Sequence, residues 1–470
     1  MTEVKPDFSA IKSLKIGTSG IRGVFGETLT PEIAANFAAA FTTTLREKGI
    51  SRPKVLVASD SPGFGEVLAM AVSSGIMYSG GIPVYLGLLP APAAQVNAFL
   101  IGAAGGILAV TAHNDFRWKA LKFFREDGAF LNAAQMEELI DLYNLGEFSK
   151  AGWREIASEE TVNDAWDRYE SYLKKYFKPF KKNLRVLVDT VNSALSIYIG
   201  SLLESLNVEY MVINQDITSS PKRPPDPTLE NLKELISLAS LSGFDLSAAF
   251  DFDSDRVTFV DENGKFCGED ATFLLLADYL LKNSLKSSSR RQRIVIANTS
   301  VSQAIEDIAE KYSAKVERVR VGQAYIGDGV KNHSAVIGGE GNGSVVLPEI
   351  SLAQDGIAAL LYALNILDEN FDVSFSDLTS SLPSYHMIKK TFKVPFGVSY
   401  KVLESMRKSF KRFPTVDISD GIKVFMDEKT WFHVRVSQTE QALRVIVESD
   451  RQEEADRVFG AIESLIEAYL

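Results

Sequence analysis

Residues 246–256 read LSAAFDFDSDR, an apolar run that predicts a buried strand with an acidic loop directly after it. The loop presents three carboxylates at alternate positions, Asp251, Asp253 and Asp255. Carboxylates this close repel one another, and a hard divalent cation with oxygen ligands relieves that repulsion. Arg256 follows and adds a fixed positive charge suited to an anionic ligand. The stretch therefore predicts a metal-binding loop at the end of a strand.

Two other interpretations of this loop stay open. One is a solvated acidic turn without a metal. The other is the Ca²⁺ loop of an EF-hand, which would end where Glu262 stands. That loop needs glycine where this chain has Arg256, and the apolar runs on both sides predict strands rather than flanking helices.

Composition limits the class of protein. The chain has 470 residues with 46% hydrophobic content, which is too long for a single core and predicts several domains. A net charge of -11 argues against a nucleic-acid partner, although a local basic pocket can still hold a small anion. The single cysteine, Cys267, excludes an internal disulfide. With no long apolar run and no signal-peptide pattern, we expect a cytoplasmic protein with no membrane partner.

The order of apolar runs predicts α/β layers followed by a different carboxyl-terminal segment. Short β-branched runs alternate with amphipathic helical stretches from residue 55 onward, and the alternation restarts near residue 184. After about residue 378, runs at 422–426, 431–436 and 443–448 instead predict antiparallel strands with helices on one face, an α+β arrangement. The predicted domains are 1–152, 153–260, 261–378 and 379–470.

Three further motifs have the composition of an anion or polyol site. GTSGIRG at 17–23 offers backbone N–H groups, the hydroxyl of Ser19 and the guanidinium of Arg22 to a phosphate. GGEGNG at 338–343 would present Glu340 and Asn342 to vicinal hydroxyls. RVSQTEQALR at 435–444 brackets two hydroxyl residues with two arginines. Each motif taken alone is also typical of an ordinary glycine turn or an exposed strand end.

Taken together and in this order, the four motifs resemble the α-D-phosphohexomutase family of phosphoglucomutases, phosphomannomutases and phosphoglucosamine mutases. The resemblance implies four domains around a central cleft: three similar α/β domains with mixed sheets and a carboxyl-terminal α+β domain. It implies Mg²⁺ as cofactor, a hexose phosphate as ligand and an isomerase activity. In that reaction an enzyme phosphoserine passes its phosphoryl group to the sugar, and the resulting 1,6-bisphosphate returns the other phosphate.

The resemblance also assigns roles to individual residues. The three aspartates would hold Mg²⁺, with Arg256 and Ser19 beside the substrate. WKALK at 118–122 is similar to the segment after the family's active loop, which makes Lys122 a candidate for proton transfer or for a phosphate contact, with a solvated lysine as the alternative. Arg22 is a further catalytic candidate. The sugar hydroxyls would contact Glu340 and Asn342. The phosphate that is not transferred would be bound by Arg435, Ser437, Thr439 and Arg444.

The chain departs from the family at the phosphate carrier itself. The family's active loop is Thr-Ala-Ser-His-Asn-Pro, whereas residues 110–115 read VTAHND, so that Ala112 stands in the serine position. A methyl group cannot carry phosphate. Thr111 offers the neighbouring hydroxyl, but alternate strand residues face opposite ways, so it would reach the metal only after a one-residue register shift. His113 matches the family and would orient phosphate or shuttle protons, or else be a structural polar residue.

Other departures accompany this one. The family's Gly-Arg-Asp turn appears as Ala58-Ser59-Asp60, and Gln354 stands where an arginine is common. Two functions follow. We favour a phosphohexomutase that uses an atypical carrier, or a supplied hexose 1,6-bisphosphate, to interconvert 1- and 6-phosphates of glucose, mannose or glucosamine. The alternative is a catalytically silent relative that senses a phosphosugar or assists an active mutase. The preferred hexose, and whether the protein is a monomer or a dimer, stay open.

Overall fold

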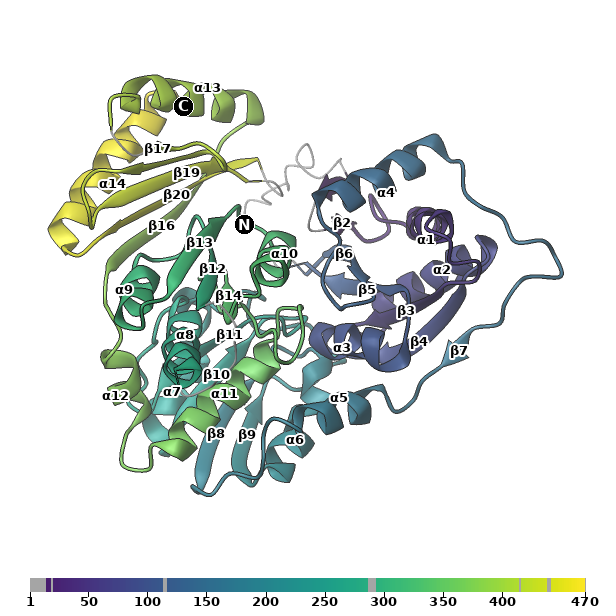
Figure 1. Ribbon diagram of the computed structural model, residues 1–470, viewed down its shortest axis with the longest axis horizontal. Helices are drawn as coiled ribbons and strands as arrows, with labels where there is room; N and C mark the ends of the chain where they lie inside the picture. Colours follow the sequence, from purple (N-terminus) through teal and green to yellow (C-terminus); the bar gives the residue numbers. More distant parts are fainter. Residues whose placement is uncertain are drawn as a thin grey trace, which may run out of the picture. The chain divides into compact units, whose positions relative to one another are not determined.

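A computed structural model of the chain describes residues 14–17, 20–112, 116–285, 293–413, 416–437 and 441–469. The chain divides into two compact units. The first unit comprises Met1–Thr272 and Asn342–Asp377, and the second comprises Phe273–Gly341 and Leu378–Leu470. Helices and strands alternate along most of both units (Figure 1).

The first unit begins with a seven-stranded mixed sheet in the order β1-β2-β6-β5-β3-β4-β7. Strands β3, β4, β5 and β7 are parallel to their neighbours among themselves, while β6 pairs antiparallel with both β5 and β2. The elements of this part are β1 (Lys15–Gly17), β2 (Gly20–Val24), α1 (Pro31–Glu47), β3 (Lys54–Ser59), α2 (Phe64–Tyr78), β4 (Ile82–Leu88), α3 (Ala91–Ile101), β5 (Gly105–Thr111), β6 (Trp118–Arg125), α4 (Ala133–Leu145) and β7 (Glu160–Thr161).

The core of this sheet lies on the face that carries Val55, Val57, Ile107 and Ala109, under α1, α2 and α4 (Figure 1). Helices α1 and α2 approach closely because Gly75 has no side chain. A Cβ atom there would lie 2.1 Å from a backbone oxygen of α1. Along β5 this face carries Ile107, Ala109 and Thr111, whereas the other face carries Leu108 and Val110.

The first unit continues with a second mixed sheet, of order β11-β10-β8-β9, in which β10 is parallel to β8 and antiparallel to β11. A short strand, β15, and a helix buried along most of its length, α11, return to this unit from later in the chain. The elements are α5 (Ala165–Leu173), β8 (Leu184–Asp189), η2 (Ala194–Ile197), α6 (Ile199–Ser205), β9 (Val208–Ile213), η3 (Leu229–Asn231), α7 (Lys233–Ser242), β10 (Leu246–Phe250), β11 (Val257–Asp261), β15 (Val345–Val346) and α11 (Gly356–Glu369).

The second unit contains parallel strands in the order β13-β12-β14, followed by a five-stranded antiparallel sheet of order β16-β20-β19-β18-β17. Its elements, with the two helices that cross the boundary between the units, are α8 (Ala271–Ser284), β12 (Ile294–Asn298), α9 (Ala304–Lys311), β13 (Lys315–Val319), α10 (Gln323–His333), β14 (Ile337–Gly339), α12 (Phe375–Ser380), β16 (His386–Lys393), α13 (Phe396–Phe410), β17 (Val416–Asp417), β18 (Ile422–Phe425), β19 (Trp431–Val436), β20 (Ala442–Ser449) and α14 (Gln452–Glu467).

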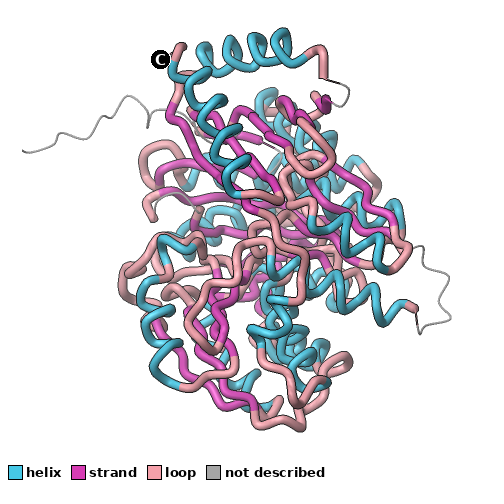
Figure 2. Tube along the Cα trace, turned by 90° about the vertical axis from the view of Figure 1, so that its left-hand side faces the viewer, coloured by secondary structure: helices cyan, strands magenta, loops and turns pink. Residues whose placement is uncertain are grey.

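The antiparallel sheet has two unlike faces. One face is apolar and packs under α13 and α14, which lie near the C label in Figure 2. The register of β18, β19 and β20 places five polar side chains and one tryptophan together on the other face, next to Phe425 and Ile446. We call this the polar face; its members are Lys423, Trp431, His433, Arg435, Arg444 and Glu448.

The predicted fold class is confirmed by these mixed α/β sheets and the antiparallel carboxyl-terminal sheet with helices on one face. The four predicted domain boundaries stay predictions. Within the described part of the chain, no helix is long and apolar enough to span a membrane.

Candidate active site

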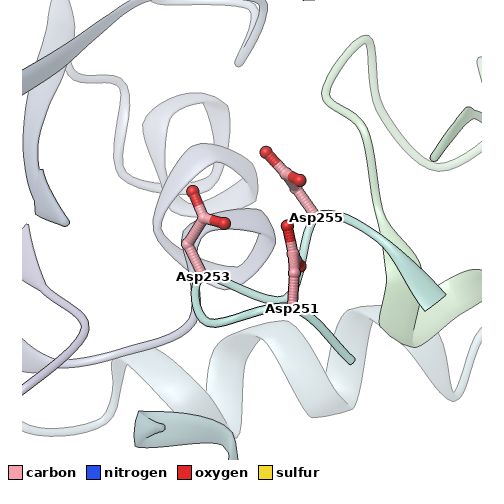
Figure 3. Close-up of side chains that lie close together, drawn as sticks. All are labelled: Asp251, Asp253 and Asp255. Carbon is pink, nitrogen blue, oxygen red and sulfur yellow. The ribbon is translucent and has the colours of Figure 1, made fainter. Parts of the chain in front are cut away.

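The acidic loop forms as the sequence predicts, in the connection between β10 and β11. Asp251, Asp253 and Asp255 are 3%, 5% and 1% exposed, and one carboxylate oxygen from each lies within 4.8 Å of the others. All three side chains project to the same side of the loop (Figure 3). Three buried carboxylates with converging oxygens are the donor set that a hard divalent cation prefers, so these residues fit Mg²⁺.

The pKa values of Asp251 and Asp255 are shifted in opposite directions. Burial, with Asp255 and Asp253 close by, holds the pKa of Asp251 well above its ordinary value. Burial also acts to raise the pKa of Asp255, but the positive charges of Lys122 and Arg256 outweigh it and bring that pKa below its ordinary value. The ionised form of these buried carboxylates is therefore favoured by the positive charges next to them.

One of those cations is Lys122, which reaches the loop from strand β6. Its Nζ donates hydrogen bonds to Asp253 and, at 2.9 Å, to Oδ2 of Asp255. Burial acts to lower the pKa of Lys122, but Asp253 and Asp255 raise it by more, so the side chain is an ammonium ion. Arg22 pairs with Ala120, two residues before Lys122, and so shares its sheet face.

Arg256 is held by the proline-containing loop at 219–227. Its Nη1 donates to Asp226 at 3.0 Å, and its Nε lies 3.6 Å from Oδ2 of Asp251. Arg223 anchors the same loop, because its Nε donates to Asp189 at 2.6 Å and its Nη2 to the carbonyl of Phe250 at 2.7 Å. No motif in the sequence indicated Arg223 and Asp226.

Helix α11 supports the metal loop from behind. The N–H of Gly356, the first residue of the helix, donates to the carbonyl of Ser254 at 3.2 Å. Asp355 caps the helix by accepting from the Ala358 N–H at 2.8 Å, and the Tyr169 hydroxyl lies 2.9 Å from both of its carboxylate oxygens. Burial raises the pKa of Asp355 to about 6. The positive end of the helix dipole thus lies beside an acidic loop, which it stabilises.

The carrier position lies at the end of β5. The register pairs Leu108 with Lys122 and Thr111 with Lys119, so that Thr111 and Lys122 belong to opposite faces of the sheet. The N–H of Ala112 donates to the carbonyl of Trp118 at 2.9 Å, so the alternation extends to Ala112 and places its methyl group on the Lys122 face. Ser19, His113 and Thr439 lie outside the described residues.

In the second unit, Arg435 and Arg444 lie directly opposite each other on β19 and β20. Like charges in this arrangement destabilise a sheet unless an anion neutralises them. Burial, followed by the charge of Arg444, lowers the pKa of Arg435 to about 10, while Asp420 and Glu340 act against this shift. Ser437 is buried at the end of the same strand pair. Paired arginines next to a hydroxyl suit bidentate binding of phosphate.

The predicted sugar-binding residues belong to different units. Glu340, in the second unit, accepts from the Gly322 N–H at 2.9 Å and from Nδ2 of Asn298 at 3.3 Å. Asn342, in the first unit, accepts from the Ser344 hydroxyl at 2.7 Å. Glu340 is therefore fixed as a buried acceptor whose orientation is set by backbone and amide donors.

Comparison with protein families matches the first three parts of the chain in order. Residues 13–150, 167–264 and 268–385 match alpha/beta/alpha domains I, II and III of phosphoglucomutase/phosphomannomutase. A phosphoglucomutase/phosphomannomutase of Thermococcus kodakarensis is 30% identical over 93% of this chain and 95% of its own length. The chain belongs to the α-D-phosphohexomutase family.

Solved structures agree with this family at the level of the fold. A phosphoglucomutase/phosphomannomutase family protein from Burkholderia thailandensis superposes with a TM-score of 0.83 at 21% identity, covering 96% of this chain and 97% of its own. Aspergillus fumigatus N-acetylphosphoglucosamine mutase, solved with GlcNAc-6P and magnesium, gives 0.64 at 13% identity, covering 97% and 96% of the two chains. Its serine-to-alanine variant, solved with glucose 1,6-bisphosphate, gives 0.57 at 12% identity, covering 98% and 96%. Relatives in this α-D-phosphohexomutase family carry mutase names, as the predicted isomerase class requires.

We predict that His433 makes the folded protein less stable at acidic pH. Its Nδ1 lies 3.1 Å from the Ser300 hydroxyl and its Nε2 2.5 Å from the carbonyl of Asp420, and burial lowers its pKa to about 4. Because the unfolded chain binds this proton more readily, stability is complete above about pH 6.5 and falls as pH drops toward 4, by on the order of 3 kcal/mol. Urea titrations at several pH values should show this loss, and a much smaller one in His433→Gln. An equal loss in both proteins would contradict the prediction.

Proposed function

We propose that the protein is a Mg²⁺-dependent phosphohexomutase that interconverts the 1- and 6-phosphates of glucose, mannose or glucosamine. The observation that carries this proposal is the buried triad of Asp251, Asp253 and Asp255, which Lys122 contacts from the strand that follows the carrier position. Phosphoryl transfer depends on positioning and on neutralising charge, and this arrangement supplies both kinds of group.

Each of the site residues has its own role in the proposed reaction. The three aspartates hold Mg²⁺, which when bound neutralises charge on the phosphoryl group being transferred. Lys122 holds a proton at Nζ and gives it to, or takes it from, the sugar oxygen, while Arg22 on the same sheet face binds the phosphoryl oxygens. Glu340 and Asn342 orient sugar hydroxyls. Ser19, His113 and Arg256 complete the contacts to substrate, and Arg435, Ser437, Thr439 and Arg444 bind the second phosphate.

A supplied hexose 1,6-bisphosphate is the phosphoryl donor that the geometry favours. The bisphosphate transfers one phosphoryl group to the free hydroxyl of a hexose monophosphate and remains as a monophosphate, while the acceptor becomes the new bisphosphate. Ala112 has no nucleophilic atom, and the Thr111 hydroxyl lies on the face opposite Lys122, 3.5 Å from Asp60. A serine-to-alanine variant of the Aspergillus enzyme was solved with glucose 1,6-bisphosphate, the kind of donor proposed here.

The test is a mutase assay with Mg²⁺, a trace of hexose 1,6-bisphosphate and each of the three hexose 1-phosphates. We expect slow turnover that requires the bisphosphate, and a rate higher by about 10²-fold or more in Ala112→Ser, because a covalent carrier divides one difficult step into two. Radiolabelled bisphosphate should leave no label on the unmodified protein. Label recovered on Thr111 would contradict the supplied-donor mechanism.

A catalytically silent phosphosugar-binding protein, acting as a sensor or as a partner of an active mutase, is the second candidate, and the methyl group of Ala112 is the observation that favours it. The two candidates differ in one measurement. A silent protein binds hexose phosphate and Mg²⁺ in calorimetry but gives no product at any bisphosphate concentration. A cytoplasmic location suits either function, since both need access to hexose phosphates, and a monomeric or dimeric state stays a prediction.

A further inference from the structure

Lys119 is a buried lysine that the proposed mechanism does not use. Its side chain lies on the sheet face opposite Lys122 and is only 2% exposed. A lysine is almost never buried so fully unless other groups compensate its charge. Its place beside the end of β5, directly opposite Thr111, connects it with the carrier position.

The contacts of Lys119 converge on the residues around Ala112. The Nζ atom donates to the Thr111 hydroxyl at 3.4 Å and lies 3.2 Å from the ring centre of Phe64 and 3.9 Å from that of Phe116. Such positions over aromatic faces stabilise a cation in the absence of water. Phe116 in turn lies 6.0 Å from Phe252, which stands between the first two aspartates of the metal loop. Lys119 thus touches both the carrier strand and a ring that packs on the metal loop.

Asp60 is the acidic partner in this region. Its carboxylate accepts from the Thr111 N–H at 2.6 Å and from the Ser61 hydroxyl at 2.7 Å, and so fixes the backbone next to Ala112. Burial raises the pKa of Asp60 to about 7; Lys119 acts against this shift and Asp253 adds to it. The charge of Lys119 therefore favours the ionised form of the carboxylate that holds the end of β5.

At position 59 this chain has an uncharged serine, whereas the buried positive charge of Lys119 comes from β6. The family's Gly-Arg-Asp turn places an arginine where this chain has Ser59, next to Asp60. Ser59 is 1% exposed, and its hydroxyl makes no hydrogen bond with any described residue. It faces the first turn of α2, since a Cβ on Gly65 would lie 3.2 Å from its Oγ, and Phe64 of that same turn contacts Lys119. Position 59 and the Lys119 ammonium thus reach the same place from two strands.

We propose that Lys119 is a positioning residue of the active site, which supplies from β6 the buried positive charge that an arginine at position 59 would supply, and which holds Asp60 and the end of β5 in place. The inference rests on the proposed function only in treating the Ala112 position as part of the active site. The effect of the Lys119 charge on the end of β5 can be measured without any catalytic activity.

The experiment compares hydrogen exchange of the peptide segment 105–112 and the thermal midpoint in four variants. Lys119→Met keeps most of the volume and removes the charge, so we expect exchange at the end of β5 to be faster by about tenfold or more. Lys119→Arg, and Lys119→Ala combined with Ser59→Arg, restore a cation to the same place and should keep exchange close to that of the unmodified protein. Lys48→Met removes an exposed lysine of the same part of the chain and should change neither quantity.

Each outcome decides the proposal. Exchange in Lys119→Met that equals the unmodified protein would show that the ammonium is not needed, and would overturn it. Faster exchange in Lys119→Met that neither arginine-bearing variant corrects would also overturn it, because volume rather than charge would then matter. Absence of mutase activity in all of these proteins would count against the proposed function and would leave this comparison intact.

Discussion

The Lys122→Met variant is expected to unfold at a markedly lower denaturant concentration than the unmodified protein when Mg²⁺ is absent. Adding Mg²⁺ is expected to recover most of this loss of stability. Lys122 is the ammonium ion that contacts both Asp253 and Asp255, and all of these groups are buried. Removing one partner of a buried ion pair leaves uncompensated charge and costs about 3 to 5 kcal/mol. A bound divalent cation neutralises the same carboxylates and adds about 2.7 kcal/mol at a hundred times its dissociation constant.

The measurement is urea unfolding with EDTA and with saturating Mg²⁺. Lys54→Met is a matched control, because Lys54 pairs with Glu160 at 2.7 Å but both side chains are over 40% exposed. Its loss should cost less than about 1 kcal/mol, and this cost should be the same with and without Mg²⁺. Absence of stabilisation by Mg²⁺ in both variants would contradict the assignment of the triad as a metal site. Mutase activity of Lys122→Met should also fall by about 10²- to 10⁴-fold, as expected for loss of a proton-transfer group.

Replacing Gly356 with alanine is expected to weaken Mg²⁺ binding by about 10- to 100-fold, the range seen when a group that supports metal ligands is disturbed. A Cβ atom at this position would lie 2.9 Å from the carbonyl oxygen of Ser254 and from the carbonyl carbon of Arg256. Both atoms are backbone of the metal loop, so the loop itself must move. Isothermal titration of the purified variant with Mg²⁺ measures the effect directly.

Gly460→Ala provides the control for this substitution. Gly460 lies within α14, and an added Cβ there meets no atom within 4 Å, so alanine should be neutral or should stabilise the helix by roughly 0.5 to 1 kcal/mol. Unchanged Mg²⁺ affinity in Gly356→Ala would show that the metal loop is not held by α11, and the supporting role of that helix would have to be abandoned.

The local part of the site could be predicted from the sequence. Alternating carboxylates after an apolar run led to the metal loop, and the family resemblance led to Lys122, which the structure brings to Asp253 and Asp255. The alternation of strand residues also indicated that Thr111 would point away from the metal, and the register places Thr111 on the sheet face opposite Lys122. These inferences were possible because they depend on spacing within one strand or one loop, or on the family pattern.

The supporting groups could not be predicted, because they come together only through long-range folding. Tyr169 and Asp355 are 186 positions apart, and Asp60 meets the Thr111 N–H across 51 positions. The family pattern indicated Lys122, whereas the sequence does not show that Lys119 is buried against the rings of Phe64 and Phe116. Spacing alone does not say which distant side chains share a buried site.

The polar face of the carboxyl-terminal sheet has a mechanical consequence. Lys423 donates to the carbonyl of Thr299 at 2.8 Å, His433 contacts Ser300, and Glu448 accepts from the Gln303 N–H at 2.8 Å, so this sheet is fastened to the loop after β12 by hydrogen bonds. Water can replace each of these bonds, whereas exposing the apolar face of the same strands would cost about 25 cal/mol for every Å². The sheet is therefore held by hydrophobic contacts on its apolar face and by replaceable hydrogen bonds on its polar face. The two arginines that we propose bind a phosphate, Arg435 and Arg444, lie on the face that can detach at lower cost.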